Sequence, residues 1–215
     1  LPGHGGSLRR RNLDEYRASR MALEIDEEIA KQNPSTESVR IGRGASSVCA
    51  ENVLVGNSFG GWVATLIALR SPARYRSLLL LAPGGTTGAD EAGKDLFREP
   101  NVESLKDFQA RAYFRPRELS DTEWKYAVRR LEGSGVGEIR SAQVAEDRLD
   151  GKLRELKVET TLVWGEADRI LPRSTLQVFE KNVRGIRVRT LSECGHLPQK
   201  ECPEKLAAVL RDAIP

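Results

Sequence analysis

A glycine–serine–glycine turn between two apolar runs constrains the fold of this chain more than any other feature. Residues 53–55 read Val-Leu-Val, the turn 56–60 reads Gly-Asn-Ser-Phe-Gly, and a longer, mostly apolar run occupies residues 62–69. The pattern predicts a buried strand, a tight turn with Ser58 at its apex, and a buried helix. We expect glycine at both ends of the turn because side chains there would collide where strand and helix pack closely. The helix N-terminus would then direct N–H groups at the space above Ser58.

The same pentapeptide also occurs as an ordinary glycine-rich turn. Its interpretation therefore depends on whether the chain also supplies the other residues of a catalytic site. A serine nucleophile needs a general base and an acid that orients the base. Asp168 follows an apolar run and a glycine turn, and His196 follows the strand-like segment 186–191. Each of the three residues therefore comes after a predicted strand, in the order serine, aspartate, histidine. This arrangement predicts a catalytic triad of Ser58, Asp168 and His196.

Four segments of the chain, in this order, resemble the α/β-hydrolase superfamily. They are the loop 1–7, the nucleophile elbow 56–61, the acid turn 165–168 and the histidine loop 194–196. The resemblance covers nearly the whole chain and implies an α/β fold with a mostly parallel sheet and a helical lid insertion. It further implies that no cofactor is needed.

The resemblance also predicts how the chain is organised into core and lid and what precedes Leu1. It implies that residues 1–85 form the first part of the core, residues 86–157 the lid, and residues 158–215 the second part of the core. Strands five to eight would then be present, and we expect roughly a hundred residues with the first strands to precede Leu1. Residues 1–215 alone are therefore expected to aggregate and to be nearly inactive.

A narrower resemblance concerns segments 56–61, 81–85 and 192–196, which are similar to those of the meta-cleavage-product hydrolases. Those enzymes cleave a carbon–carbon bond in ring-opened aromatic diketo acids. In that group the asparagine before the nucleophile, here Asn57, contacts the substrate or the oxyanion. The chain departs from the group at Leu197, where the family has an aromatic residue.

The lid arginine that grips the substrate carboxylate in that group has only positional candidates here, Arg129 and Arg130. The leading hypothesis is therefore a serine hydrolase that acts on a small carboxylic ester or related acyl substrate. A carbon–carbon bond hydrolase is the first alternative, and a non-catalytic or inactive truncated member of the superfamily is the second.

Further site residues follow from the resemblance. An oxyanion hole uses two backbone N–H groups, of which the given sequence supplies that of Phe59. His4 resembles a pocket-edge histidine of the family, so we group it with Phe59 and Asn57 as candidates for oxyanion or substrate binding. A rival assignment makes His4 the general base, but His196 has the position that follows the acid strand in the superfamily order.

The composition argues against several classes of partner. Lys and Arg total 34 against 31 for Asp and Glu, a formal net charge of +3, and the charges are mixed along the chain. The basic run 9–11 has no interleaved aromatic residues, which indicates a solvated loop rather than nucleic-acid binding. No apolar run approaches the length of a membrane span. Oligomeric state stays open.

The three cysteines are Cys49, Cys194 and Cys202, an odd number without CxxC spacing. Scattered thiols and two distant histidines are too few for a metal site. We expect reduced cysteines in an intracellular compartment, with Cys194 as a buried bystander rather than a reactive thiol. Localisation stays open because a leader could precede Leu1, with the cytoplasm favoured.

Hydrophobic periodicity and breaker residues predict the remaining elements. Helices are expected at residues 12–32, through residue 70 after the turn, at 102–114, 122–131 and 139–149, and from residue 203. Strands are expected at 52–56, 77–82, 161–164 and 186–191. Most lid aromatics (Phe97, Phe108, Tyr113, Phe114, Trp124 and Tyr126) are expected to pack the lid on the core rather than line a pocket.

Overall fold

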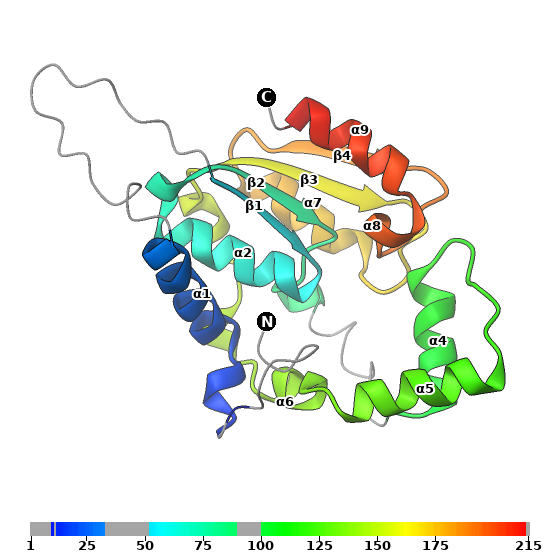
Figure 1. Cartoon of the computed structure of the whole chain (residues 1–215). Helices are drawn as coiled ribbons and strands as arrows, with labels where there is room; N and C mark the ends of the chain where they lie inside the picture. Colours follow the sequence, from blue (N-terminus) through cyan, green and yellow to red (C-terminus); the bar gives the residue numbers. More distant parts are fainter. Residues whose placement is uncertain (1–9, 11, 33–51, 90–99, 214–215) are drawn as a thin grey trace, which may run out of the picture.

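The computed structural model describes residues 10, 12–32, 52–89 and 100–213, and within them a parallel β-sheet forms the centre of the molecule (Figure 1). Its strands are β1 (Asn52–Asn57), β2 (Tyr75–Leu81), β3 (Glu159–Gly165) and β4 (Arg187–Leu191). Their order in the sheet is β1-β2-β3-β4, and all three neighbouring pairs are parallel. The predicted parallel sheet is therefore confirmed, with strand bounds within two residues of those expected.

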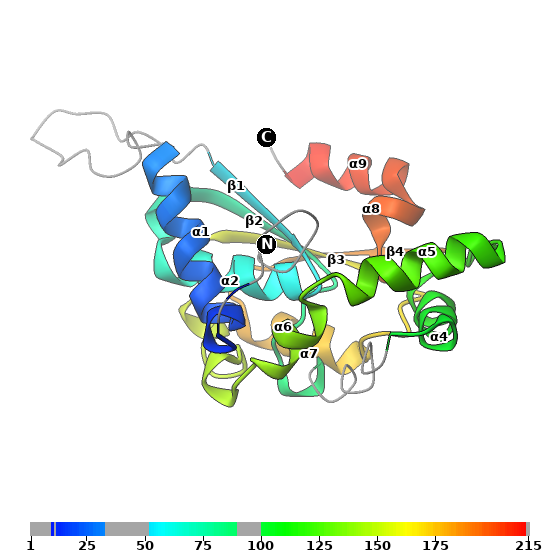
Figure 2. The ribbon, with the colours of Figure 1, turned by 60° about the horizontal axis from the view of Figure 1, so that its bottom comes forward.

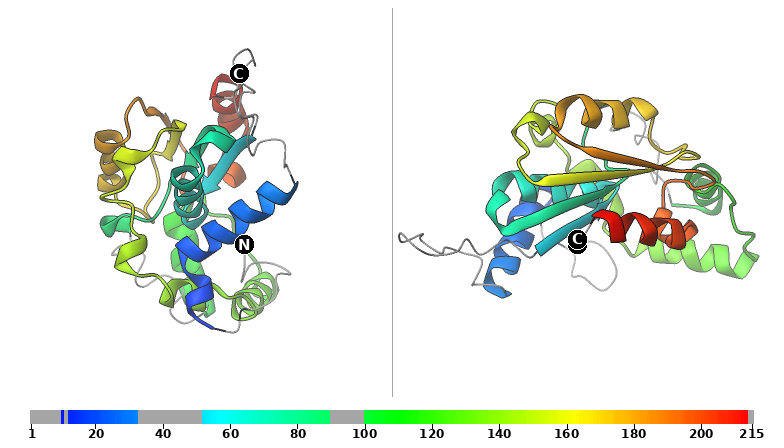
Figure 3. Two further views of the ribbon diagram at one scale, coloured as in Figure 1. Left: turned by 90° about the vertical axis from the view of Figure 1, so that its left-hand side faces the viewer. Right: turned by 90° about the horizontal axis from the view of Figure 1, so that it is seen from above.

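The central strands β2 and β3 are buried on both faces, and the alternation of their residues assigns them to two cores, whereas Val55 of β1 is exposed. Leu78, Leu80 and Leu162 belong to the core beneath α1 (Ala18–Gln32), α2 (Phe59–Arg70) and α7 (Arg173–Asn182). The other core contains the intervening strand residues and is covered by α9 (Pro203–Ala213). Figure 3 shows α7 and α9 on opposite sides of the sheet. Leucine runs without polar alternation are what a strand buried on both faces requires.

Short helices complete the framework around the sheet. They are the one-turn helix α8 (Pro198–Glu201) and the 3-10 helices η1 (Asp14–Tyr16), η3 (Pro72–Arg74), η4 (Ala145–Asp147) and η5 (Leu153–Glu155). In the described ranges, no helix combines the length and apolar character needed to cross a membrane.

The predicted lid region lies beyond the carboxyl ends of the strands, between β2 and β3 in the chain (Figures 1 and 2). It contains α4 (Val102–Ala112), α5 (Asp121–Glu132) and α6 (Val136–Ser141). Asn101 and Ser120 each begin a helix with a capping box, which explains where α4 and α5 start. The predicted helices 102–114 and 122–131 are confirmed to within two residues, whereas the division of the chain at residues 85 and 157 stays a prediction.

The predicted helix 139–149 is wrong, because α6 ends at Ser141. Asp147 lies in the 3-10 turn that follows, and its carboxylate pairs with the guanidinium of Arg17 at 2.9 Å. Its backbone oxygen accepts a hydrogen bond from the indole N–H of Trp62 (2.8 Å). These contacts with distant parts of the chain draw residues 144–149 onto the core and outweigh the helical periodicity.

The lid aromatics divide between packing and exposure. Phe108 and Tyr113 pack against the main core, as predicted, whereas Trp124 is buried beside Lys106 of α4 within the lid. Phe114 and Tyr126 are exposed on the surface. Phe97 lies outside the described residues. Packing on the core is therefore a role of two of these side chains, while Tyr113 and Phe114 also line the cavity described below.

Candidate active site

The turn that carries Ser58 joins the end of β1 to the start of α2 and is strained. Ser58 has φ 52° and ψ −119°, a conformation that non-glycine residues rarely adopt. Its N–H donates to the Leu81 carbonyl, and its own carbonyl accepts from the N–H groups of Gly61 and Gly84, all at 2.9 Å. With a fourth, longer bond from Trp62 N–H to the same carbonyl (3.2 Å), these contacts hold the strained backbone in place. Such strain is a common feature of functional sites.

Glycine is required at one end of this turn and not at the other. A Cβ at Gly56 would lie 2.7 Å from the Gly61 Cα and closer still to the Gly60 backbone, so the prediction for Gly56 is confirmed. A Cβ at Gly60 would meet no atom of the described chain within 4 Å, so the collision predicted there is wrong. The close contact falls one residue later, where a Cβ on Gly61 would lie 2.9 Å from the Cβ of Pro83.

Asp168 and His196 are in hydrogen-bond contact inside the protein. Their loops follow the neighbouring strands β3 and β4, whose carboxyl ends lie at the same edge of the sheet. The Asp168 Oδ2 lies 2.8 Å from His196 Nδ1, and the two side chains are 0% and 3% exposed. The other carboxylate oxygen of Asp168 accepts from the N–H groups of Ile170 (2.8 Å) and Leu171 (3.1 Å). The carboxylate is therefore held in one orientation by three donors.

This bond determines the chemistry available to the imidazole. When Nδ1–H donates to Asp168, the lone pair of His196 is on Nε2, where a general base must carry it. The nearest competing carboxylate in the sequence, Glu166, has an exposed side chain. The structure thus brings Asp168, rather than Glu166, to His196.

Asn57 connects the turn of Ser58 to the loop of His196. Its Nδ2 donates to the carbonyl oxygens of Leu81 (2.9 Å) and His196 (3.1 Å), and its Oδ1 accepts from Gln199 (3.2 Å). Both amide protons are thus engaged with the protein backbone. Asn57 therefore ties the two loops together in this structure, and its contact with the oxyanion or substrate stays a prediction.

The other residues predicted to bind the oxyanion or substrate differ in where the structure places them. Phe59 is the first residue of α2, so its N–H has no acceptor within the helix and lies beside Ser58. His4 and the loop 1–7 lie outside the described residues. Arg129 and Arg130 are exposed in the last turn of α5. The triad itself stays a prediction, since the structure shows the Asp168–His196 bond and the strained turn of Ser58.

The histidine loop is closed by a disulfide between Cys194 and Cys202, so the expectation of reduced cysteines is wrong for this pair. The helical turn of α8 carries residue 202 back toward residue 194, and the two Cα atoms lie 6.1 Å apart. That separation is within the usual range for a disulfide. Sequence inspection found no CxxC spacing and therefore missed a pair that meets only after a turn. Cys49 lies outside the described residues.

The C-terminal end of α4 contacts both loops. The Ala112 carbonyl accepts from His196 N–H (2.7 Å), and the Arg169 guanidinium donates to the carbonyls of Ala110 (2.6 Å) and Tyr113 (3.0 Å). Glu201 joins the same region through its carboxylate, and sequence reasoning missed it. Pro198 and Pro203, which bracket a single helical turn after His196, are the sequence signal that could have pointed to it.

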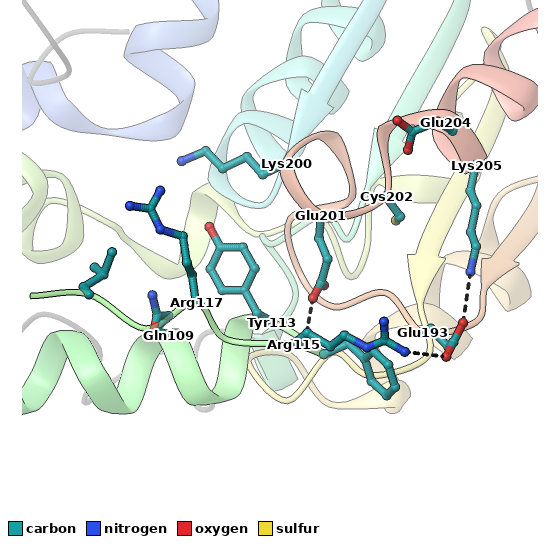
Figure 4. Close-up of a pocket in the computed structure, with 12 residues that line it drawn as sticks. Gln109, Tyr113, Arg115, Arg117, Glu193, Lys200, Glu201, Cys202, Glu204 and Lys205 are labelled. Atoms are coloured by element: carbon teal, nitrogen blue, oxygen red, sulfur yellow. Dashed lines mark hydrogen bonds and ion pairs between the residues drawn. The ribbon is translucent and has the colours of Figure 1, made fainter.

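A cavity of about 660 Å³ lies between the lid and the histidine loop (Figure 4). It is lined by residues between 109 and 119 and by residues between 193 and 205, and most of these side chains are charged. Burial, together with the nearby charge of Glu201, raises the pKa of the Tyr113 phenol in this wall. The cavity lining does not include Ser58, Asp168 or His196.

The chain is similar in sequence to known hydrolases. A model of the alpha/beta hydrolase family matches residues 1–209. Monoacylglycerol lipase ABHD6 of Bos taurus is 24% identical over 241 residues, which cover 100% of this chain and 65% of the lipase. The 2-hydroxy-6-oxo-6-phenylhexa-2,4-dienoate hydrolase of Comamonas testosteroni is 29% identical over 163 residues, which cover 69% of this chain and 57% of that enzyme. The chain thus spans less than two thirds of these relatives.

Solved structures support the fold. The esterase EaEST from Exiguobacterium antarcticum superposes with a TM-score of 0.73 at 20% sequence identity, covering 99% of this chain and 78% of the esterase. At this level of identity the similarity concerns the fold.

Proposed function

Because this chain belongs to the alpha/beta hydrolase family, we propose that it is a serine hydrolase that acts through an acyl-enzyme. Ser58 is the nucleophile, His196 the general base and Asp168 the acid that orients the base. The substrate is a small carboxylic ester or a related acyl compound. One of the relatives named above is a monoacylglycerol lipase, which supports this class of substrate.

The observation that carries the proposal is the buried bond between Asp168 and His196. A histidine shielded from water beside a carboxylate is favourable when the imidazole must become cationic during a reaction, because the carboxylate stabilises that charge. The strained backbone of Ser58 at the start of α2 is the second support, since it is the conformation of a nucleophile elbow. The Asn57 bond to the His196 backbone links these two parts of the site.

The proposed reaction proceeds in two halves. His196 Nε2 removes the proton of the Ser58 hydroxyl as the oxygen attacks the carbonyl carbon of the substrate, and the Phe59 N–H donates to the developing oxyanion. The imidazolium then gives its proton to the leaving oxygen, which departs as an alcohol. Water, deprotonated by His196, attacks the acyl-enzyme and releases the carboxylic acid.

Labelling of the full-length gene product with a fluorophosphonate probe tests the nucleophile. Ser58 is expected to carry the label, as located by mass spectrometry of its peptide. Ser58→Ala should abolish labelling and lower turnover of a short-chain ester by several orders of magnitude while the thermal midpoint changes little. Unchanged turnover in that variant would refute the assignment, and an unlabelled wild type would favour a non-catalytic member of the family.

A second candidate function is hydrolysis of a carbon–carbon bond in a ring-opened diketo acid. The observation that favours it is the 29% identity to the Comamonas testosteroni enzyme. Parallel assays with short-chain esters and with a ring-opened aromatic diketo acid separate the two functions. Turnover of the diketo acid well above that of every ester would favour the second function.

A further inference from the structure

Glu201 holds two backbone N–H groups from different parts of the molecule. Its Oε2 accepts from Gly195 N–H at 2.6 Å, and its Oε1 accepts from Arg115 N–H at 2.8 Å. Gly195 lies in the histidine loop, whereas Arg115 lies just after the lid helix α4. Figure 4 shows Glu201 pointing from α8 toward Arg115. One carboxylate therefore joins the lid to the histidine loop.

The peptide groups at positions 195 and 196 are both anchored at this junction. Glu201 holds the N–H of Gly195, and the Ala112 carbonyl of the lid holds the N–H of His196. A Cβ at Gly195 would lie 2.9 Å from the Ala112 carbonyl carbon and 3.0 Å from the Tyr113 Cα. The lid backbone thus packs directly on the peptide that precedes the histidine, and the close approach requires glycine there.

The position of Glu201 is fixed by contacts that do not involve the lid. Its N–H donates to the Leu197 carbonyl at 3.1 Å within the turn of α8, and Pro198 begins that turn. The next residue, Cys202, is bonded to Cys194. Both ends of the short loop that contains the histidine are therefore constrained, and the carboxylate needs little rearrangement to accept both donors.

On the basis of the function proposed above, we propose that Glu201 is a positioning residue that couples docking of the lid to placement of His196. When the lid segment 112–115 leaves, His196 loses its bond to Ala112 and Glu201 loses one of its two donors. The histidine is then held by its bond to Asp168, by the bond from Asn57 to its carbonyl and by the remaining bond of Glu201 to Gly195. The general base is fully positioned only when the lid is docked, so that catalysis is linked to enclosure of the substrate.

Glu201→Gln and Glu201→Ala in the full-length gene product test this role, with Glu204→Gln as the matched control. Glu204 is an exposed carboxylate that lines the same cavity, so its variant makes the same change of charge. In Glu201→Gln, an NH₂ group replaces one acceptor and faces a backbone N–H. We expect kcat per titrated serine to fall about ten- to hundredfold, corresponding to loss of a charge-assisted bond, with KM nearly unchanged. The kcat of Glu201→Ala should fall further than that of Glu201→Gln, and the kcat of Glu204→Gln should equal that of the wild type.

Hydrogen exchange provides a readout that does not depend on activity. The amides of Arg115 and Gly195 should both exchange faster in Glu201→Ala, which removes both acceptors, than in the wild type and in Glu204→Gln. Faster exchange at only one of the two amides, or an equal fall of kcat in the control, overturns the coupling. If the wild type hydrolyses no ester, the proposed function fails, while the exchange result still decides whether Glu201 joins the two segments.

Discussion

Reduction of the Cys194–Cys202 disulfide should destabilise the protein by an amount that follows from its position in the chain. The two cysteines are separated by eight residues in sequence. In the chain-entropy model, a cross-link that closes a loop of this length stabilises the folded state by about 2.5 kcal/mol, because it restricts the unfolded chain. For a domain of this size, that loss corresponds to a fall of about 5–10 °C in thermal midpoint.

The assay compares oxidised and reduced forms of the same protein, which avoids any change in side-chain volume at the buried positions. Thermal or urea unfolding of the full-length gene product is measured with and without a phosphine reductant. Mass spectrometry of a non-reducing digest shows whether the peptides containing Cys194 and Cys202 are linked in each sample. A Cys49→Ser variant serves as the control, because it removes the third cysteine and any exchange with it.

Two results would refute the reasoning. Absence of the linked peptide from protein kept under oxidising conditions would show that the two cysteines do not pair. An unchanged unfolding midpoint after complete reduction would show that the loop is already fixed by its other bonds, those of His196 to Asp168 and of Gly195 to Glu201. The state of the linked peptide in protein alkylated inside cells would also test the cytoplasmic location expected from the sequence.

Three further substitutions test the site and its support. Asp168→Asn should lower turnover about ten-thousandfold with substrate affinity nearly intact, whereas Glu166→Gln should leave turnover unchanged. The reverse result would identify Glu166 as the acid. Asn57→Ala should lower the free energy of unfolding by about 1–3 kcal/mol, measured in urea, because the carbonyls of Leu81 and His196 each lose one donor. A loss of turnover at full stability would instead indicate an oxyanion contact. Burial raises the pKa of the Asp147 carboxyl, but hydrogen bonds from Arg17 and Ser19 outweigh it, and the net pKa in the folded state is lowered. Asp147→Asn should therefore be less stable than the wild type near neutral pH, and the difference in unfolding midpoint should shrink as the pH falls below about 4, since a carboxylate with a depressed folded pKa loses its stabilising contribution there. If the difference in unfolding midpoint between Asp147→Asn and the wild type stayed constant down to pH 3, the conclusion that the pKa of Asp147 is lowered in the folded state would be contradicted.

The relation between sequence and fold is clearest at the turn around Ser58. The apolar run 53–55, the glycine at position 56 and the apolar run that follows are local signals, and the structure has the strand, the turn and the helix where they predict them. The same holds for the leucine run of β2, which is buried on both faces. In each case the required information lies within about ten neighbouring residues.

The roles of several side chains depended on partners that are distant in the sequence. The helical periodicity of residues 139–149 is real, but the pairing of Asp147 with Arg17 and Trp62 ends the helix early. The resemblance predicts a substrate or oxyanion contact for Asn57, and the structure adds a second role, since its amide donates to the backbone carbonyls of Leu81 and His196. No local pattern reports such contacts.

The sequence by itself determined the positions of the four strands, the turn around Ser58 and the residues most suited to carry chemistry. Those features follow from hydrophobic periodicity, turn residues and residue type, all of which act over short stretches of chain. Only the tertiary structure decided that Cys194 pairs with Cys202, that Gly61 rather than Gly60 is crowded, and that Glu201 bridges lid and histidine loop. The physical reason is that a hydrogen bond, a disulfide or a close contact depends on which distant backbone is brought alongside when the sheet and the lid pack together.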